Sequence, residues 1–313
     1  MRPYDTQWNV SIQQQVLPRV SVEFGYYRRS FHNFFVSDNT NLAASDFQTY
    51  SFAAPSDPKL GSQSGQTVSY VIPKAGVNTS NINNVYTSVQ AITGNGDDWS
   101  NHWNGFDFTV TARGAHGFTA NFGTSTGRAV TDYCAVAAKV PELYNGVLTG
   151  GAAAAPLGFS NGIFNLASSC HQEENWNTSA RGYLTYIIPK ADVLVSVITR
   201  SSLNSSFGFG STPEGNSAGL SANLAQAANG VAGYGFNLLP PGQFYGDRVN
   251  ITDFRFGKIL NWGRTRTNVA IDLLNAFNTN TATGFQLTYG SAFMTPTAIV
   301  SARVMKFNVT VDF

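Results

Sequence analysis

Apolar and polar residues alternate one by one in many segments of this 313-residue chain. Every second residue is apolar from Trp8 to Ile12, and the same alternation runs from Val20 to Tyr26. Because successive side chains of a β-strand point to opposite faces, a period of two places the apolar residues on one face. A helix, with its period of 3.6 residues, does not produce this pattern. The alternation therefore predicts strands that are apolar on one side and polar on the other.

Four predicted hairpins and a final strand share this construction. Each hairpin contains two alternating segments and, between them, a turn of about four residues: 16–19, 114–117, 189–192 or 261–264. The segments are residues 8–12 with 20–27, 106–113 with 118–122, 180–186 with 193–197, and 251–256 with 268–273, and the last strand runs from Ala298 to Phe313. The third hairpin is the least regular, because Leu194 and Ile198 interrupt its polar side. This count predicts about nine strands.

The connections alternate between short and long. Tight turns lie within the hairpins, whereas polar segments rich in Gly, Ser and Asn separate them, near residues 32–100, 134–176, 203–248 and 279–297. Transmembrane β-barrels have short periplasmic turns and long extracellular loops. We therefore expect an all-β fold in a single unit, residues 1–313, that is part of an antiparallel up-and-down transmembrane β-barrel of about nine strands.

The final strand gives this topology a direction. Its odd-numbered residues from Met305 onward are apolar and are expected to face lipid, as Phe307, Val309, Val311 and Phe313 do in this prediction. Its even-numbered residues are expected to face the barrel lumen, and only Val304 breaks that pattern. The charged residues predicted to line the lumen are Glu23, Asp107, Arg113, Arg181, Asp253, Arg255, Asp272, Lys306 and Asp312. The favoured interpretation is structural: opposite charges pair along the wall, on which a plug would rest.

A soluble β-sandwich or propeller is the alternative, because its strands also alternate where one face packs on a core. Four long loops are unusual in a sandwich. The composition is 42% hydrophobic, 13% aromatic and only 12% charged, so few charges are available to solvate a globular surface. The net charge of +1, without a basic cluster, excludes nucleic acid as a partner. No apolar run approaches the roughly 20 residues of a transmembrane helix.

The residues with reactive side chains give no pattern of a catalytic or metal site. No Gly-x-Ser-x-Gly elbow and no phosphate-binding loop occur, so neither an enzyme activity nor a cofactor is expected. The four histidines are dispersed and argue against a metal site: His32, His102, His116 and His171. Cys134 and Cys170 are 36 positions apart, and a disulfide is favoured over two unrelated thiols. The His171–Glu174 segment is interpreted as a solvated polar patch.

Five aromatic residues near predicted strand ends are candidates for the membrane interface or for contact with an extracellular ligand. The interface is the favoured interpretation for all of them: Trp99, Trp103, Trp176, Tyr245 and Tyr289.

The C-terminal segment, residues 302–313, resembles the closing strand of TonB-dependent receptors, in which alternating apolar residues precede a terminal Phe. Residues 268–278, with their Asn-x-x-Asn ending, are similar to the penultimate strand of that family. Residues 245–248 followed by 255–258 look like the strand before it. Residues 7–13 and 125–134 resemble the barrel of Oar-like receptors, which carry a carboxypeptidase-regulatory-like domain.

The resemblance implies the C-terminal barrel portion of such a receptor, located in the bacterial outer membrane, without the plug, the TonB box, a signal peptide and the N-terminal strands. It implies contact with outer-membrane lipid and with the barrel-assembly machinery through the C-terminal strand. TonB would act only through the missing N-terminal part, and the extracellular ligand is unknown. The expected function is TonB-dependent uptake; the alternative is an adhesin or a structural outer-membrane protein that transports nothing.

Overall fold

The structure is a computed structural model, and it describes residues 2–79, 81–145, 163–204, 206–207, 219–220, 235–240, 242–287 and 289–312. Nine long strands form one antiparallel sheet in which each strand pairs with its sequence neighbour among the nine. In sheet order they are β1 (Tyr4–Leu17), β2 (Val20–His32), β7 (Ser100–Arg113), β8 (Thr119–Asp132), β11 (Asn177–Ile188), β12 (Val193–Ser202), β17 (Val249–Trp262), β18 (Thr265–Leu274) and β21 (Val304–Asp312). The predicted all-β, antiparallel, up-and-down meander of about nine strands is confirmed, and the short β10 (His171–Glu173) joins the sheet as a tenth strand beside β8.

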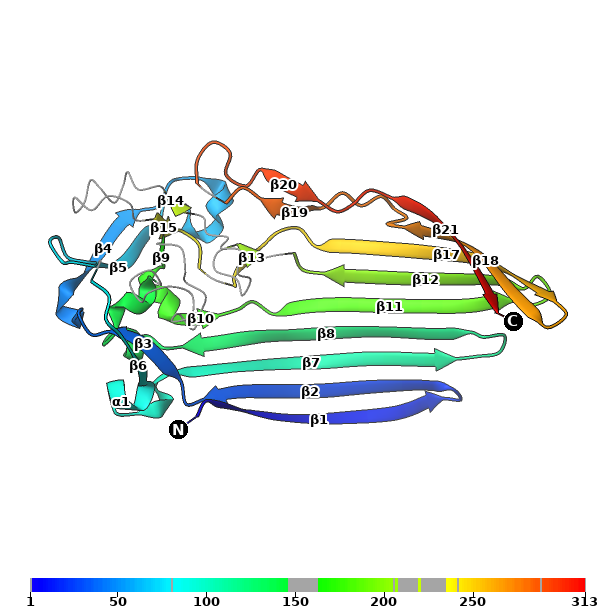
Figure 1. Cartoon of the computed structure of the whole chain (residues 1–313), viewed down its shortest axis with the longest axis horizontal. Helices are drawn as coiled ribbons and strands as arrows, with labels where there is room; N and C mark the ends of the chain where they lie inside the picture. Colours follow the sequence, from blue (N-terminus) through cyan, green and yellow to red (C-terminus); the bar gives the residue numbers. More distant parts are fainter. Residues whose placement is uncertain are drawn as a thin grey trace.

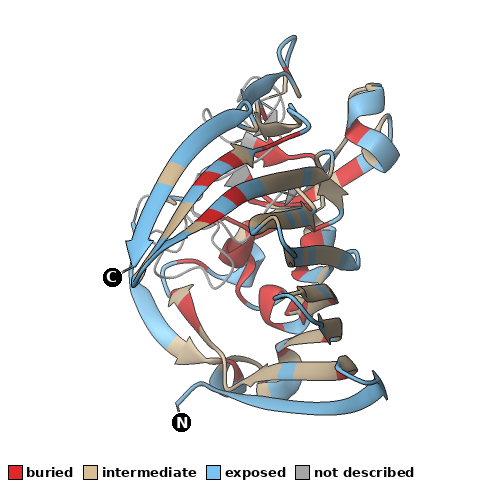
Figure 2. Cartoon of the chain, turned by 90° about the vertical axis from the view of Figure 1, so that its right-hand side faces the viewer, coloured by how far each residue is buried: buried red, intermediate tan, exposed pale blue. Residues whose placement is uncertain are grey.

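All the tight turns lie at one end of the sheet and all the long connections at the other, as Figure 1 shows. The turn between β17 and β18 consists of Gly263 and Arg264, and Gly263 adopts a φ of 61°, which glycine tolerates without strain. Seen along the strands, the sheet bends into an open arc (Figure 2). Among the described residues β1 and β21 each have one neighbouring strand, so the sheet is not closed into a barrel.

The long connections fold into short elements of their own. The strands are β3 (Phe35–Asn39), β4 (Phe47–Ala53), β5 (Thr67–Pro73), β6 (Asn84–Ser88), β9 (Ile163–Phe164), β10 (His171–Glu173), β13 (Ser206–Phe207), β14 (Gly219–Leu220), β15 (Gly235–Asn237), β16 (Phe244–Tyr245), β19 (Ala282–Phe285) and β20 (Pro296–Ile299). The helices are α1 (Val89–Thr93) and α2 (Cys134–Ala137), with 3-10 turns η1 (Ala44–Asp46), η2 (Pro58–Gln63), η3 (Gly96–Asp98), η4 (Pro141–Tyr144) and η5 (Ala167–Cys170).

These connections share a hydrophobic core, and we call their described residues within 33–99, 133–176, 203–248 and 275–303 the loop cap. Tyr70 of β5, Phe164 of β9 and Phe236 of β15 are fully buried in one cluster, and Phe293 joins them from the last connection. The centroids of the Tyr70 and Phe236 rings lie 4.7 Å apart. All four connections thus contribute to one core. The prediction that these connections are polar segments is therefore incomplete, because they also contain buried hydrophobic residues.

The last strand is shorter than predicted. Ala298 and Ile299 belong to β20, which pairs with β19, and β21 begins at Val304. The cause is the Asn-x-x-Asn segment after β18: Asn275 and Asn278 both adopt positive φ, of 48° and 53°. Asn275 Nδ2 donates a hydrogen bond to the carbonyl of Ser301 at 2.8 Å, and Asn278 Oδ1 accepts one from the amide of Arg303. These bonds divert the backbone between β20 and β21.

Candidate functional site

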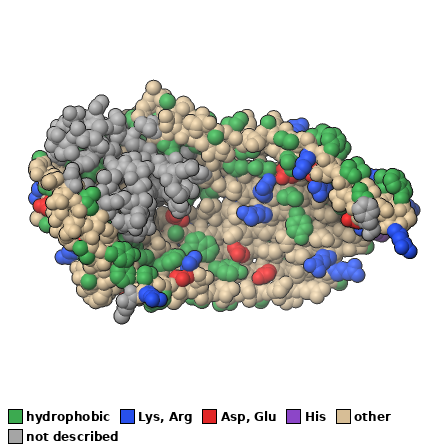
Figure 3. All heavy atoms as spheres, in the orientation of Figure 1, with side chains coloured by type: hydrophobic (Ala, Val, Ile, Leu, Met, Phe, Trp, Pro, Cys, Tyr) green, Lys and Arg blue, Asp and Glu red, His purple; other side chains and the backbone are tan. Residues whose placement is uncertain are grey.

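The register of the long sheet places all nine predicted lumen residues on one face. Residues opposite one another in an antiparallel ladder share a face, and side chains alternate along each strand. Glu23 lies opposite Thr109, Asp107 opposite Gly25, and Arg181 opposite Arg200. We call this side of the sheet the polar face; its predicted members are Glu23, Asp107, Arg113, Arg181, Asp253, Arg255, Asp272, Lys306 and Asp312. In Figure 3 this face carries scattered positive and negative side chains over a largely uncharged surface.

Charge pairing on the polar face is strongest between β17 and β18. Arg255 Nε and Nη2 donate to the two carboxylate oxygens of Asp272 at 2.5 and 2.8 Å, a bidentate arrangement. Asn308 Nδ2 of β21 donates to the same carboxylate at 2.7 Å. Lys306 lies opposite Asp272 in the register of β18 and β21. This cluster ties the last three strands together.

A second group contains residues that the sequence analysis missed. Arg200 of β12 pairs with Asp253 of β17 at 3.2 Å, and the Asp253 carboxylate also accepts the backbone amide of Asn275 at 2.8 Å. A third pair, Arg29 with Asp5 at 2.8 Å, joins β2 to β1. The alternation would have placed both on the polar side, because Arg29 shares the parity of Glu23 on β2 and Asp5 shares the parity of the polar residues Asn9 and Ser11 on β1.

The opposite side of the sheet, the apolar face, is exposed. Phe307, Val309 and Val311 lie on it as predicted, with exposed fractions of 70%, 66% and 42%; the prediction for Phe313 falls outside the described residues. Other exposed apolar side chains of the long strands on this face are Trp8, Val10, Ile12, Phe24, Phe106, Phe108, Phe122, Leu184, Phe256 and Ile271. Monomeric soluble proteins rarely expose a continuous apolar surface of this kind.

Aromatic side chains border the apolar face toward the loop cap. The ring centroids of Trp8 and Tyr26 lie 5.3 Å apart, those of Tyr26 and Phe106 5.1 Å, and those of Phe106 and Trp176 5.9 Å. The guanidinium of Arg128 lies over the Trp176 ring at 5.1 Å. We call Trp8, Tyr26, Phe106 and Trp176 the aromatic row; it runs over β1, β2 and β7 and reaches across β8 to the segment before β11.

Of the five aromatic residues predicted at the membrane interface, only Trp176 lies on the apolar face. The prediction is wrong for Trp99, which is 3% exposed and stacked on Tyr133 in the loop cap, with ring centroids 5.0 Å apart. It is also wrong for Trp103, which lies opposite Arg29 on the polar face. Tyr245 and Tyr289 both lie in the loop cap, where Tyr289 packs against Phe293. Proximity to a strand end did not reveal the direction of these side chains.

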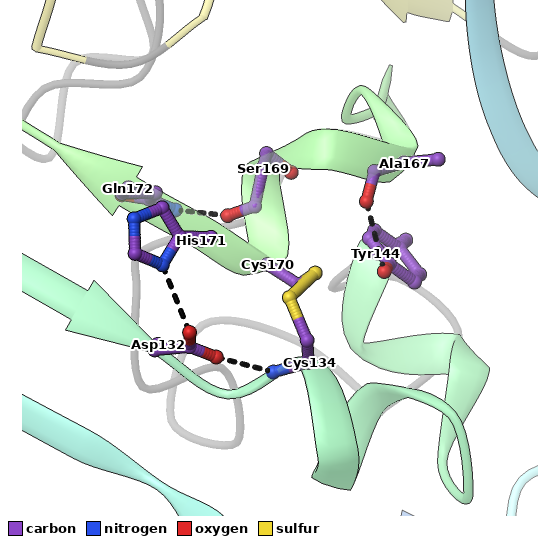
Figure 4. Close-up of a disulfide and its surroundings, with 8 residues drawn as sticks. All are labelled: Asp132, Cys134, Tyr144, Ala167, Ser169, Cys170, His171 and Gln172. Carbon is purple, nitrogen blue, oxygen red and sulfur yellow. Dashed lines mark hydrogen bonds and ion pairs between the residues drawn. A yellow bond between two sulfur atoms is a disulfide. The ribbon is translucent and has the colours of Figure 1, made fainter.

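A disulfide closes the second long connection, as favoured from the sequence. Cys134 begins α2 directly after β8, Cys170 ends η5 directly before β10, and their Cα atoms lie 4.8 Å apart (Figure 4). The amide of Tyr133 donates to the carbonyl of Cys170 at 2.9 Å. The disulfide thus holds the two ends of this connection together where they leave the sheet.

The His171–Glu174 segment, predicted as a solvated polar patch, is engaged with β8. His171 Nδ1 lies 2.8 Å from Asp132 Oδ2 (Figure 4), and Glu173 forms an ion pair with Arg128. Glu174 accepts the amide of Ala129, and burial raises the pKa of its carboxyl. No group of three or more His, Cys, Asp or Glu side chains suited to a metal ion is present among the residues that the structure describes.

Polar side chains inside the loop cap join three of its connections. Tyr70 Oη donates to the carbonyl of Asn237 at 2.9 Å, Asn237 Nδ2 donates to Asn165 Oδ1 at 3.3 Å, and Asn165 Nδ2 donates to the carbonyl of Tyr144. All these side chains are buried. Because an unpaired polar group in a core is costly, such a network fixes the relative positions of the connections.

A carboxyl is buried in the second cluster of the loop cap. Glu142 of η4 is 1% exposed, and its Oε1 accepts the amide of Asn39 at 3.0 Å. Burial is the main reason that the pKa of Glu142 is raised to about 7; hydrogen bonds from the backbone amides of Glu142 and Asn39 oppose this shift, and the nearby Asp38 carboxyl adds a smaller contribution to it. The carboxyl of Asp38 also has a raised pKa, chiefly through burial. The two acids link β3 to η4.

Within the described part of the chain, no helix has the length and apolar character needed to cross a bilayer. No protein-family model matches the chain, and no curated protein matches it. Among solved structures, it is similar to the crystal structure of the outer membrane transporter YddB from Escherichia coli, with a TM-score of 0.44 and 10% sequence identity. The match covers 98% of this chain and 32% of that one, so the chain spans about a third of the length of that transporter.

Proposed function

We propose that this chain forms part of a transmembrane β-barrel in the bacterial outer membrane. In this proposal lipid covers the apolar face, the polar face lines the barrel interior, and the loop cap lies outside the cell. The observation that carries the proposal is the exposed apolar face with its aromatic border. Water would be in contact with Phe307 and Val309 on a soluble protein, whereas hydrocarbon makes their exposure favourable.

The height of the apolar face supports this location. The aromatic row lies at the level of Phe106, which is paired with Thr126 of β8. Phe118 and Tyr186 meet near the tight turns, with ring centroids 6.3 Å apart. From residue 118 to residue 126, eight steps of about 3.3 Å give a separation of roughly 26 Å along the strand. The apolar band of an outer-membrane barrel is about 25 Å tall and is bordered by aromatic residues at both interfaces.

We further propose TonB-dependent uptake as the function of the whole receptor, energised through a part that precedes β1. The resemblance of the three last strands to that family supports this assignment. The paired charges around Asp272 and Asp253 supply a hydrophilic, electrically balanced wall against which a plug can rest. The loop cap supplies an ordered outer surface for an extracellular ligand, and the C-terminal strand is the segment that the barrel-assembly machinery would engage.

Sedimentation of the purified chain tests the membrane assignment. Without detergent we expect aggregation, because the apolar face has no cover; with detergent or phosphatidylcholine vesicles we expect a folded protein that floats with the vesicles and resists alkaline extraction. A folded monomer in detergent-free buffer would contradict the lipid-facing assignment of Phe307, Val309 and Val311.

Transport is tested separately from membrane insertion. If the coding sequence upstream encodes a plug domain and a TonB box, the transport assignment is supported, and deletion of the TonB box should abolish uptake. A signal peptide joined directly to further strands would refute transport and favour an adhesin that displays the same loop cap.

A further inference from the structure

Two aromatic rings on the polar face lie flat against the sheet. Gly105 of β7 and Gly127 of β8 are opposite one another, and a Cβ on either glycine would overlap the indole of Trp103. The phenol ring of Tyr27 occupies the corresponding space over Gly25. Each ring therefore has one side against the backbone. The glycines are required here because any larger residue would lift the ring from the sheet.

These rings line an open hollow of about 460 Å³ at the end of the polar face near the loop cap. Its lining consists of three aromatic residues, two amides and three charged residues: Trp8, Tyr27, Trp103, Gln7, Asn9, Arg28, Arg29 and Asp107. The register brings them together, because Tyr27 lies opposite Gly105 and Arg29 opposite Trp103, while Asn9 lies opposite Tyr27. The volume falls within the usual range of about 300–1,000 Å³ for small-molecule sites.

The charges of this hollow are balanced, because Arg28 and Arg29 in its lining are offset by Asp107 in the lining and by Asp5 beside Arg29. The Arg29 guanidinium lies 2.8 Å from Asp5, and Gln7 Nε2 donates to the same carboxylate at 2.6 Å. The Asp107 Oδ1 atom is buried and accepts no hydrogen bond from any described residue. Asp107 also lines the hollow, and its carboxylate can accept a hydrogen bond from a hydroxyl but repels an anion. The polar groups thus suit a neutral ligand that carries hydrogen-bond donors.

We propose that this hollow binds a neutral oligosaccharide, whose sugar rings stack on Trp103 and Tyr27 and whose hydroxyls bond Asp107 and the amides of Gln7 and Asn9. One face of a pyranose consists of C–H groups with partial positive charge, which pack on the negative face of an aromatic ring. Its edge carries hydroxyls that both donate and accept. A flat aromatic surface beside amides and the Asp107 carboxylate matches both features. The site deepens the transport proposal and rests on it, since it assigns a substrate class to the polar face.

Saturation-transfer NMR on the full chain in detergent micelles tests the site. The probes are maltohexaose, cellohexaose and isomaltohexaose, with a sulfated hexasaccharide as the anionic comparison. We expect at least one neutral probe to bind and Trp103→Ala to weaken its binding on the order of tenfold, which corresponds to about 1.4 kcal/mol. Tyr183→Ala is the matched control and should leave binding unchanged, because Tyr183 is an exposed aromatic side chain on the polar face outside the lining of the hollow.

Two further variants keep the test decisive. Trp103→Phe retains a ring and should bind with intermediate affinity even if Trp103→Ala folds poorly, and Asp107→Asn retains an acceptor oxygen and should keep neutral-sugar binding. The site is refuted if no neutral probe binds, if Trp103→Ala and Tyr183→Ala behave alike, or if the sulfated probe binds best. Vesicle flotation of the same samples separates this failure from that of the membrane assignment, because a protein that inserts but binds no sugar refutes only the site.

Discussion

The long sheet and the loop cap differ in where their apolar side chains lie. In the cap, aromatic residues such as Tyr70, Phe164 and Phe236 are fully buried against one another. In the nine long strands, Ile259 and Ala270 are the buried hydrophobic residues among those described, and large apolar side chains such as Phe307 are open on one face. The cap is thus stabilised by its own core in water. The long sheet has no such core among its described residues, and the proposed function assigns lipid as the cover of its apolar face.

This contrast explains the arrangement of the connections. A loop that only joins two strands needs few residues, as the turn at Gly263 and Arg264 shows. The long connections instead have enough residues to bury a core, a disulfide and a polar network at the end of the sheet. Substitutions in the cap core should therefore lower the stability of the cap, whereas substitutions on the apolar face should lower the stability of the sheet.

The largest expected effect comes from the cap core. Phe236→Ala removes a fully buried ring that contacts Tyr70, Phe52 and Phe164. We expect the unfolding free energy of the cap to fall by about 3–5 kcal/mol, while hydrogen exchange of the long strands stays unchanged. Exchange measured residue by residue in detergent gives both values. Ile82→Ala, at a 43% exposed position of the cap, is the control; similar losses in the two variants would contradict a common core.

Removal of the disulfide is expected to act next. Replacement of Cys134 and Cys170 by Ser frees a connection of 36 positions, for which chain entropy predicts a loss of at most about 4 kcal/mol. The loss of stability should appear as faster exchange of amides in the β8–β10 ladder and in α2, which flank the disulfide, rather than in the β7–β8 turn. Hydrogen exchange of oxidised and reduced protein measures it. Equal acceleration along the whole of β8 would show that the disulfide supports the sheet as well.

On the sheet, the two faces should respond differently to the same charge. Val110 and Thr109 are neighbours in β7, but Val110 shares the apolar face with Phe122 and Thr109 shares the polar face with Glu23. Val110→Arg should cost about 2–4 kcal/mol in lipid vesicles, because it places a cation in hydrocarbon. Thr109→Arg should cost less than about 1 kcal/mol. Guanidinium unfolding in vesicles gives both numbers, and equal costs would refute the assignment of faces.

The smallest expected effect is a pH dependence confined to the loop cap. The pKa of Glu142 is about 7 in the folded cap, against a usual value of 4.5, because the side chain is buried beside Asp38. The folded cap therefore binds a proton that the unfolded chain releases, and cap stability falls as pH rises from about 5 through 7. This pKa difference corresponds to at most roughly 3 kcal/mol.

Cap unfolding measured at pH 5 and pH 8 checks this dependence. The protein should be less stable at pH 8, and Glu142→Gln should flatten the difference while retaining an acceptor for the amide of Asn39. A variant that kept the full pH dependence would show that another group is responsible.

The sheet was predictable from the sequence because alternation is a local signal. The pattern of β21 alone assigned Phe307 and Lys306 to opposite faces, and the register agrees. Pairing partners were harder to find: Asp272 was predicted to face inward, but its bidentate contact with Arg255 depends on the register between strands. The break before Val304 depended on side-chain bonds from Asn275 and Asn278, which lie in another segment.

The loop cap was missed because its core is assembled from segments far apart in the sequence. Tyr70 and Phe236 are separated by more than half of the chain, and no periodicity links them. A weak local signal did exist, since Tyr50 and Phe52 alternate with polar residues in β4, as Val68 and Tyr70 do in β5. Trp103 was misplaced for a similar reason: its direction follows from the parity of β7, which proximity to a strand end does not give.

The most direct test of the two-faced sheet is a nitroxide scan of β21 in lipid vesicles. Single cysteines from Met305 to Val311 are labelled in turn, with Cys134 and Cys170 left in their disulfide. At odd positions the label should be more accessible to oxygen, which concentrates in hydrocarbon, and at even positions more accessible to a water-soluble nickel chelate. A period of two in the ratio of these accessibilities is the predicted result. High nickel accessibility at Phe307 and Val309, equal to that at Lys306 and Asn308, would contradict the account.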